Sequence, residues 1–87
     1  MSKHVTHQII LIDTPTISGL LVAQVLQRLL GYSAGLAFKL VRDTEASPTG
    51  RAPCHTGSLL ECCRLAKRIR ESGVPCEVHP FAEEADE

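Results

Sequence analysis

The sequence predicts an α+β fold, a two-layer sandwich in which three helices cover one face of a three-stranded antiparallel sheet. Short aliphatic segments typical of strands alternate with segments whose apolar residues recur at helical spacing, in the order β-α-α-β-α-β. Turn-forming residues separate these segments, and the chain of 87 residues has the size of one domain.

The first strand is predicted at residues 7–12, a run rich in isoleucine that stops at the turn-forming residues 13–15. The proline of this turn ends the strand because it has no backbone N–H to donate to a neighbour. A helix is predicted behind the turn at residues 18–30, with Ser18 as its N-cap and Thr16 as the alternative. Its apolar residues form one inward stripe: Leu21, Val22, Val25, Leu26 and Leu29.

A second helix is predicted at residues 34–44, with Ser33 as its N-cap. Its inward residues are predicted to be Leu36, Ala37, Leu40 and Val41. Leu36 and Phe38 cannot both point the same way, so one of them is expected to be partly exposed. Residues 45–50 are turn formers and predict a loop. Residues 51–55 can form a short strand, and Pro53 makes this segment either an edge strand or an irregular one because proline interrupts pairing on one side.

The third helix is predicted at residues 57–72, beginning at Thr56 or Ser58 and ending before Gly73. Its inward stripe is predicted to be Leu59, Cys62, Cys63, Ala66 and Ile69. The last strand is predicted at residues 74–79. Alternation places Val74, Cys76 and Val78 on one face of this strand and Glu77 and His79 on the other.

We expect residues 1–6 to be a flexible N-terminus, residues 7–81 to form the single domain and residues 82–87 to be an acidic tail.

The composition of the chain narrows the range of its expected partners. A formal net charge of −1 gives no overall attraction to nucleic acid or to an anionic membrane, so neither is a predicted partner. No apolar run approaches the ~20 residues that span a bilayer, and no signal-peptide segment follows the N-terminus, so we expect a cytoplasmic protein.

Thiol and imidazole groups occur on two predicted strands, at Cys54, His55, Cys76 and His79. A zinc site needs four such ligands converging at about 2.0–2.3 Å. Residues three apart on a strand point to opposite faces, so Cys76 and His79 are poorly placed to share a metal. Reduced, buried cysteines are the favoured interpretation. A small zinc or thiol protein is the less favoured one, and we predict no metal, no cofactor and no enzymatic activity.

Three patches of the sequence resemble one family. Residues 9–31, with the pattern Val-x-x-Val-Leu-Gln at residues 22–27, resemble the first strand, turn and helix of the Clp protease adaptor ClpS. Residues 50–52, Gly-Arg-Ala, and Pro75 are similar to two further positions of that family. The resemblance extends over residues 8–80 and implies the fold that bacterial ClpS shares with the C-terminal domain of the ribosomal stalk protein.

The resemblance also implies a function. ClpS-type adaptors deliver substrates to an AAA+ Clp protease by holding a free N-terminal amine and burying the first side chain of the substrate in an apolar pocket. The positions of this site correspond here to Asp13, Thr14, Gly19, Val22, Val41 and Glu45. Asp13 stands at the family's asparagine, Gly19 at its gating methionine and Glu45 near its histidine, so the pocket is degenerate. The two carboxylates would hold the ammonium by charge, although a simple strand-ending turn also explains residues 13–15.

The third predicted helix carries a basic face, made of Arg64, Lys67 and Arg68. Ribosomal stalk domains recruit translation factors through a charged helical face, so this feature indicates a second kind of protein-binding surface. A solvated face balanced by Glu61 and Glu71 explains the same residues. The sequence therefore predicts a non-enzymatic protein-binding module that engages a Clp-type AAA+ ATPase or the N-terminus of a substrate. A stalk-like interaction domain is the alternative.

Overall fold

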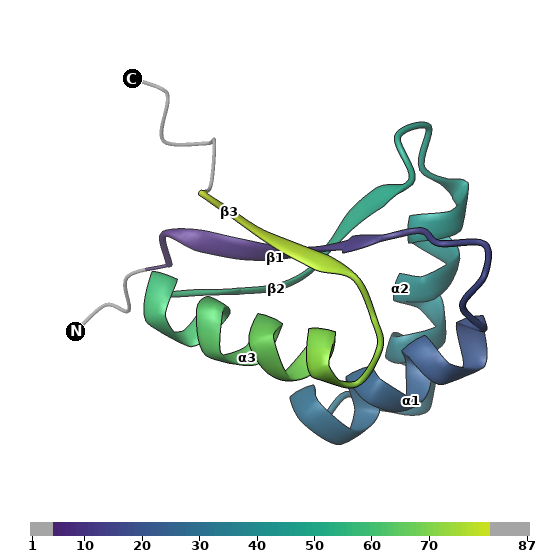
Figure 1. Ribbon diagram of the computed structural model, residues 1–87, viewed down its shortest axis with the longest axis horizontal. Coiled ribbons are helices and arrows are strands. Elements are labelled where there is room, and N and C mark those ends of the chain that lie inside the picture. Colours follow the sequence, from purple (N-terminus) through teal and green to yellow (C-terminus); the bar gives the residue numbers. More distant parts are fainter. Residues whose placement is uncertain (1–4, 81–87) are drawn as a thin grey trace.

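The computed structural model describes residues 5–80, and its elements follow the predicted order. The strands are β1 (His7–Ile12), β2 (Arg51–Gly57) and β3 (Cys76–Pro80). The helices are α1 (Gly19–Leu30), α2 (Ala34–Ala46) and α3 (Leu59–Glu71). The strands form one antiparallel sheet in the order β2-β1-β3, and the helices lie on one side of it (Figure 1), which confirms the α+β sandwich. Most of the predicted flexible N-terminus and all of the predicted acidic tail, residues 82–87, lie outside the described residues.

The central strand β1 pairs on both sides, and its register on β2 shifts once. Ile9 lies opposite His55, whereas Ile10 lies opposite Pro53, so Cys54 is an extra residue in β2. A bulge of this kind bends the strand and interrupts the alternation of its side chains. Cys54 is buried two residues after Ala52, in step with ordinary strand alternation, while the shift places His55 opposite Ile9. Pro53 lies on an edge strand, as predicted.

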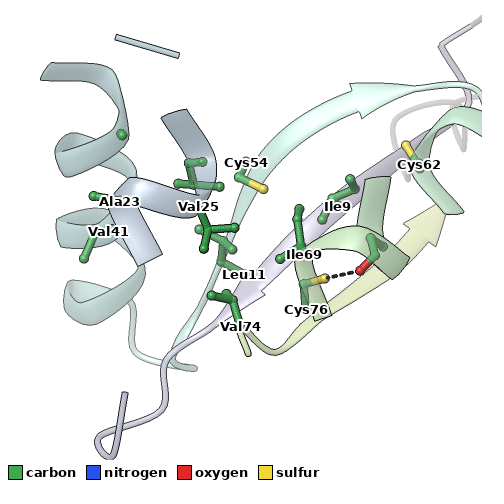
Figure 2. Packing of buried hydrophobic residues seen from close by; sticks show 13 residues of the cluster. Ile9, Leu11, Ala23, Val25, Val41, Cys54, Cys62, Ile69, Val74 and Cys76 are labelled. Atoms are coloured by element: carbon green, nitrogen blue, oxygen red, sulfur yellow. Dashed lines mark hydrogen bonds between the residues drawn. The ribbon is translucent and has the colours of Figure 1, made fainter. Parts of the chain in front are cut away.

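The core fills the space between the sheet and the helices (Figure 2). Alternate residues of β1 supply its floor, because Ile9 and Leu11 are buried while Ile10 and Ile12 are only half-buried on the other face. The largest fully buried side chains are Ile9, Leu11, Leu26, Ile69, Val25, Val74 and Cys62. The predicted alternation of the last strand is confirmed, since Val74 and Cys76 are buried and Glu77 pairs with Arg51 on the open face.

Four residues predicted to face the core are exposed instead. Leu21, Leu36 and Leu59 are 39%, 41% and 50% exposed. Each belongs to the first turn of its helix, where fewer neighbouring elements are in reach. Cys63 is exposed because adjacent helical residues point about 100° apart, and Cys62 takes the core position.

The ends of two elements differ from their predicted positions. Helix α2 continues to Ala46, two residues beyond the prediction, with Ser47 as its C-cap. Strand β2 continues to Gly57, because Gly57 still pairs with His7 of the central strand.

Two further boundaries differ after residue 57. Helix α3 begins one residue after Ser58, whose Oγ accepts a hydrogen bond from the Glu61 N–H at 3.1 Å, so Ser58 rather than Thr56 is the N-cap. Strand β3 begins at Cys76 and not at Val74. None of the helices in residues 5–80 has the length and apolar character needed to cross a membrane.

Candidate functional site

A small cavity lies where the end of β1, the turn behind it, the start of α1 and the last turns of α2 meet. Its volume is about 30 Å³. It is lined by all six residues that the sequence assigned to a pocket: Asp13, Thr14, Gly19, Val22, Val41 and Glu45. Leu11, Ile17, Thr44, Val74 and Pro75 also line it. We call it the α1–α2 cavity.

Helical spacing brings the lining residues of each helix onto one face. Gly19 and Val22 are three residues apart on α1, and Val41 and Glu45 are four apart on α2. The start of α1 is fixed by Ser18, whose Oγ accepts from the Leu20 N–H at 3.1 Å. The two helices therefore present these residues to each other across the cavity.

The inner wall of the cavity is apolar and belongs to the core. Leu11 and Val41 are 2% and 7% exposed and are part of the same buried cluster. The hydroxyl of Thr44, also buried, donates to the Leu40 carbonyl at 2.8 Å. Among residues 5–80, every buried side-chain nitrogen or oxygen has a hydrogen-bond partner. The inner wall is therefore apolar except for the Thr44 hydroxyl, whose proton is already donated.

The entrance of the cavity depends on the missing side chain of Gly19. A Cβ built there would lie 3.1 Å from Val41 Cγ1 and 3.4 Å from Glu45 Oε2. The first distance is shorter than the ~3.5–4.0 Å at which two carbon atoms pack best. Any larger residue at this position would therefore enter the cavity or displace its wall.

Two exposed carboxylates stand at the opening, and we call Asp13 and Glu45 the acidic mouth. The turn holding Asp13 is tied to the next loop, because its N–H donates to the Gly50 carbonyl at 2.7 Å. The ion pairs of the described residues involve other acids, so neither carboxylate of the mouth is neutralised by a cation there. Glu45 also lies in the last turn of α2, where the helix dipole adds further negative charge. The start of α1 partly offsets this charge.

A second surface lies on the outer side of α3. Arg64, Lys67 and Arg68 are exposed and line a shallow groove of about 720 Å³ together with Leu60. None of these three cations is in an ion pair with another residue of the range 5–80. Arg70, the next cation along the helix, is different because its Nε donates to the Cys76 carbonyl at 3.0 Å.

The cysteines and histidines between residues 5 and 80 do not assemble into a metal site. Cys54 and Cys76 lie in the core, whereas His79 lies on the open face of the sheet with its Nε2 2.8 Å from Glu77 Oε1. No group of three potential metal ligands occurs in residues 5–80. Burial raises the pKa of the Cys54 thiol to about 12, so this thiol stays protonated near neutral pH.

Sequence reasoning missed one polar cluster beside Cys54. The hydroxyl of Tyr32 donates to the Cys54 carbonyl at 2.6 Å and lies 3.4 Å from His55 Nδ1. His55 Nε2 in turn lies 2.8 Å from Glu61 Oε2 at the start of α3. These contacts join the α1–α2 loop, β2 and α3. The only signal in the sequence is that Tyr32 is the one tyrosine of the chain, directly after a helix-ending glycine.

No known family model matches the chain, and no curated protein matches it significantly.

Proposed function

We propose that the chain is a non-enzymatic protein-binding module of the ClpS adaptor type, which holds the free N-terminus of a partner protein. The observation that carries this proposal is the combination, in one cavity, of an apolar inner wall and an acidic mouth that forms no ion pair within residues 5–80. An N-terminal residue has the complementary chemistry, because its ammonium and its side chain diverge from the same carbon atom.

The binding geometry assigns a role to each part of the cavity. Asp13 and Glu45 accept hydrogen bonds from the ammonium, which carries three donors and no acceptor. The first side chain of the partner enters between Val22 and Val41. A hydrogen bond between charged groups contributes about 1.5–3 kcal/mol, which is enough to separate a free N-terminus from a blocked one.

The adaptor role is supported by the resemblance of residues 9–31, 50–52 and Pro75 to ClpS. In such a role the module would carry a bound N-terminus to a Clp-type AAA+ ATPase. Titration of a labelled module with that ATPase, with and without a bound peptide, tests this step. Absence of any association in both conditions would contradict the adaptor role and leave the peptide site as a separate question.

The peptide site is tested by fluorescence anisotropy with peptides labelled at the C-terminus. We expect micromolar binding of a peptide with a free N-terminus and at least about tenfold weaker binding after N-acetylation, since tenfold corresponds to ~1.4 kcal/mol. The pair of changes Asp13→Asn and Glu45→Gln should weaken the free peptide to a similar extent. Asp43→Asn is the matched control, because Asp43 lies on the same helix but pairs with Lys39 outside the cavity. Equal binding of the acetylated peptide would refute the proposal.

A second candidate function is favoured by the groove on α3. Leu60 is 62% exposed beside three cations that form no ion pair within residues 5–80, an arrangement that suits an acidic protein segment carrying an apolar side chain. In this function the chain is a stalk-like interaction domain that binds its partner through the basic face.

Affinity purification separates this second function from the first. Reversing the charges of Arg64, Lys67 and Arg68 should remove partners that the unchanged protein retains, and adding salt should release the same partners. The matched control reverses three exposed cations of the other two helices: Arg28, Lys39 and Arg42. If both triple variants retain the same partners as the unchanged protein, the basic face is only a solvated surface.

A further inference from the structure

We propose that the α1–α2 cavity accepts a small aliphatic first side chain, alanine or valine, and rejects leucine and the aromatic residues. This inference rests on the proposed function, because it specifies which N-termini the module binds. It differs from the general expectation of an apolar pocket, since the geometry of this chain sets an upper limit on size.

The limit follows from the volume of the cavity. An engineered cavity that binds benzene has a volume of about 150 Å³. The α1–α2 cavity has about 30 Å³. It therefore offers roughly a fifth of the space of a cavity that holds a six-membered ring, which favours the smallest aliphatic side chains. Alanine has one side-chain carbon and valine has three, whereas leucine has four and phenylalanine has seven.

The walls are poorly able to move outward. Leu11 and Val41 belong to the buried cluster, so their displacement would disturb the contacts of the core. Val22 and Val41 are β-branched residues in helices, where one side-chain rotamer is strongly preferred. Widening the cavity for a ring would therefore cost free energy that the additional contacts would have to offset.

Polarity narrows the choice among small residues. The hydroxyl of an N-terminal serine or threonine would lie against the apolar side chains of Leu11, Val22 and Val41. A buried hydroxyl without a partner costs about 1–3 kcal/mol. Alanine and valine should therefore bind more tightly than serine and threonine.

The acidic mouth also distinguishes a free amino acid from a peptide N-terminus, although both carry an ammonium and a small side chain. A free amino acid carries an ammonium beside a small side chain, but it also carries a carboxylate, which Asp13 and Glu45 would repel. The second residue of a peptide presents a neutral amide at that place. We therefore infer that the ligand is a peptide or protein N-terminus rather than free alanine or valine.

The test is isothermal titration of the full chain with peptides that differ only in their first residue: alanine, valine, serine, threonine, leucine or phenylalanine. Free alanine and the N-acetylated alanine peptide complete the series. We expect the alanine and valine peptides to bind at least about tenfold more tightly than the leucine and phenylalanine peptides. Tighter binding of leucine or phenylalanine would overturn the size limit while leaving the proposed function intact. Binding of none of the peptides, or equal binding of the acetylated one, would overturn the proposed function, and equal binding of free alanine would overturn the choice of a peptide.

A variant of the wall gives an independent check. Val22→Ala removes two carbon atoms from a half-buried position in the cavity, and should raise the affinity for the leucine peptide relative to the alanine peptide by at least about fivefold. Val78→Ala is the matched control, because Val78 is also half-buried against the core but does not line the cavity. An unchanged ratio in Val22→Ala, with circular dichroism showing a folded chain, would show that this wall does not set the size limit.

Discussion

Replacing Gly19 by alanine is the smallest change that closes the α1–α2 cavity. The new Cβ would lie 3.1 Å from Val41 Cγ1, several tenths of an ångström closer than the ~3.5–4.0 Å of a relaxed carbon contact. The backbone itself tolerates alanine, because the glycines with positive φ are Gly31, Gly50 and Gly73. The effect of the change is therefore confined to the space in front of Val41.

The expected free energy follows from two opposing contributions. Replacing glycine by alanine in a helix stabilises it by about 0.4–1 kcal/mol when nothing obstructs the new methyl group. Gly35 offers this situation, since a Cβ at Gly35 would meet no atom within 4 Å. We expect Gly35→Ala to increase the free energy of unfolding by that amount. Gly19→Ala should give a smaller increase or none, because Val41 must shift within the core.

Urea denaturation and peptide titration measure the two effects separately. The Gly19→Ala variant should stay folded and bind the alanine peptide at least about tenfold more weakly, while Gly35→Ala should bind it as the unchanged protein does. The reasoning would be refuted if Gly19→Ala gained as much stability as Gly35→Ala and kept its affinity. That result would mean that the side chain missing at Gly19 does not keep the cavity open.

Three further predictions concern the core. Ile69→Ala should lower the free energy of unfolding, measured in urea, by about 2–5 kcal/mol because Ile69 is fully buried. Exposed Leu60 is the control, and Leu60→Ala should change this free energy by less than about 0.5 kcal/mol. Similar effects of the two changes would contradict the assignment of Ile69 to the core. Tyr32→Phe should lower it by about 1–3 kcal/mol, because the Cys54 carbonyl loses its donor, and no change would show that water replaces the hydroxyl. At pH 8 a thiol reagent should label exposed Cys63 but not Cys54, because the raised pKa of about 12 keeps the Cys54 thiol protonated until the chain unfolds. Rapid labelling of Cys54 in the folded chain would contradict its burial.

Part of the candidate site could be anticipated from the sequence. The six residues assigned by resemblance to ClpS all line the cavity, but residue pattern alone also allowed a strand-ending turn at residues 13–15. Ile17, Thr44, Val74 and Pro75 line the same cavity and were not anticipated. No periodicity marks them, because they come from a turn, a helix and the segment before the last strand, which meet only in the folded chain.

The order of the helices and strands could be predicted from the sequence, because it depends on residues that are neighbours along the chain. Isoleucine-rich and alternating segments favour strands, apolar residues at helical spacing favour helices, and Ser18 and Ser33 cap the helices that follow them. The same local rules placed Pro53 at a sheet edge. These properties need no information about which segments pack together.

Packing between the elements decided which residues are buried, how the strands are aligned and where the cavity lies. Whether Leu36 is buried depends on what lies opposite the first turn of its helix, and the position of His55 opposite Ile9 depends on a shift of register between two strands. Arg70 donates through its Nε to the Cys76 carbonyl because the folded chain brings the last strand within its reach. The cavity is likewise a property of the assembled layers, since its volume is the space that side chains from separate segments leave unfilled when they meet.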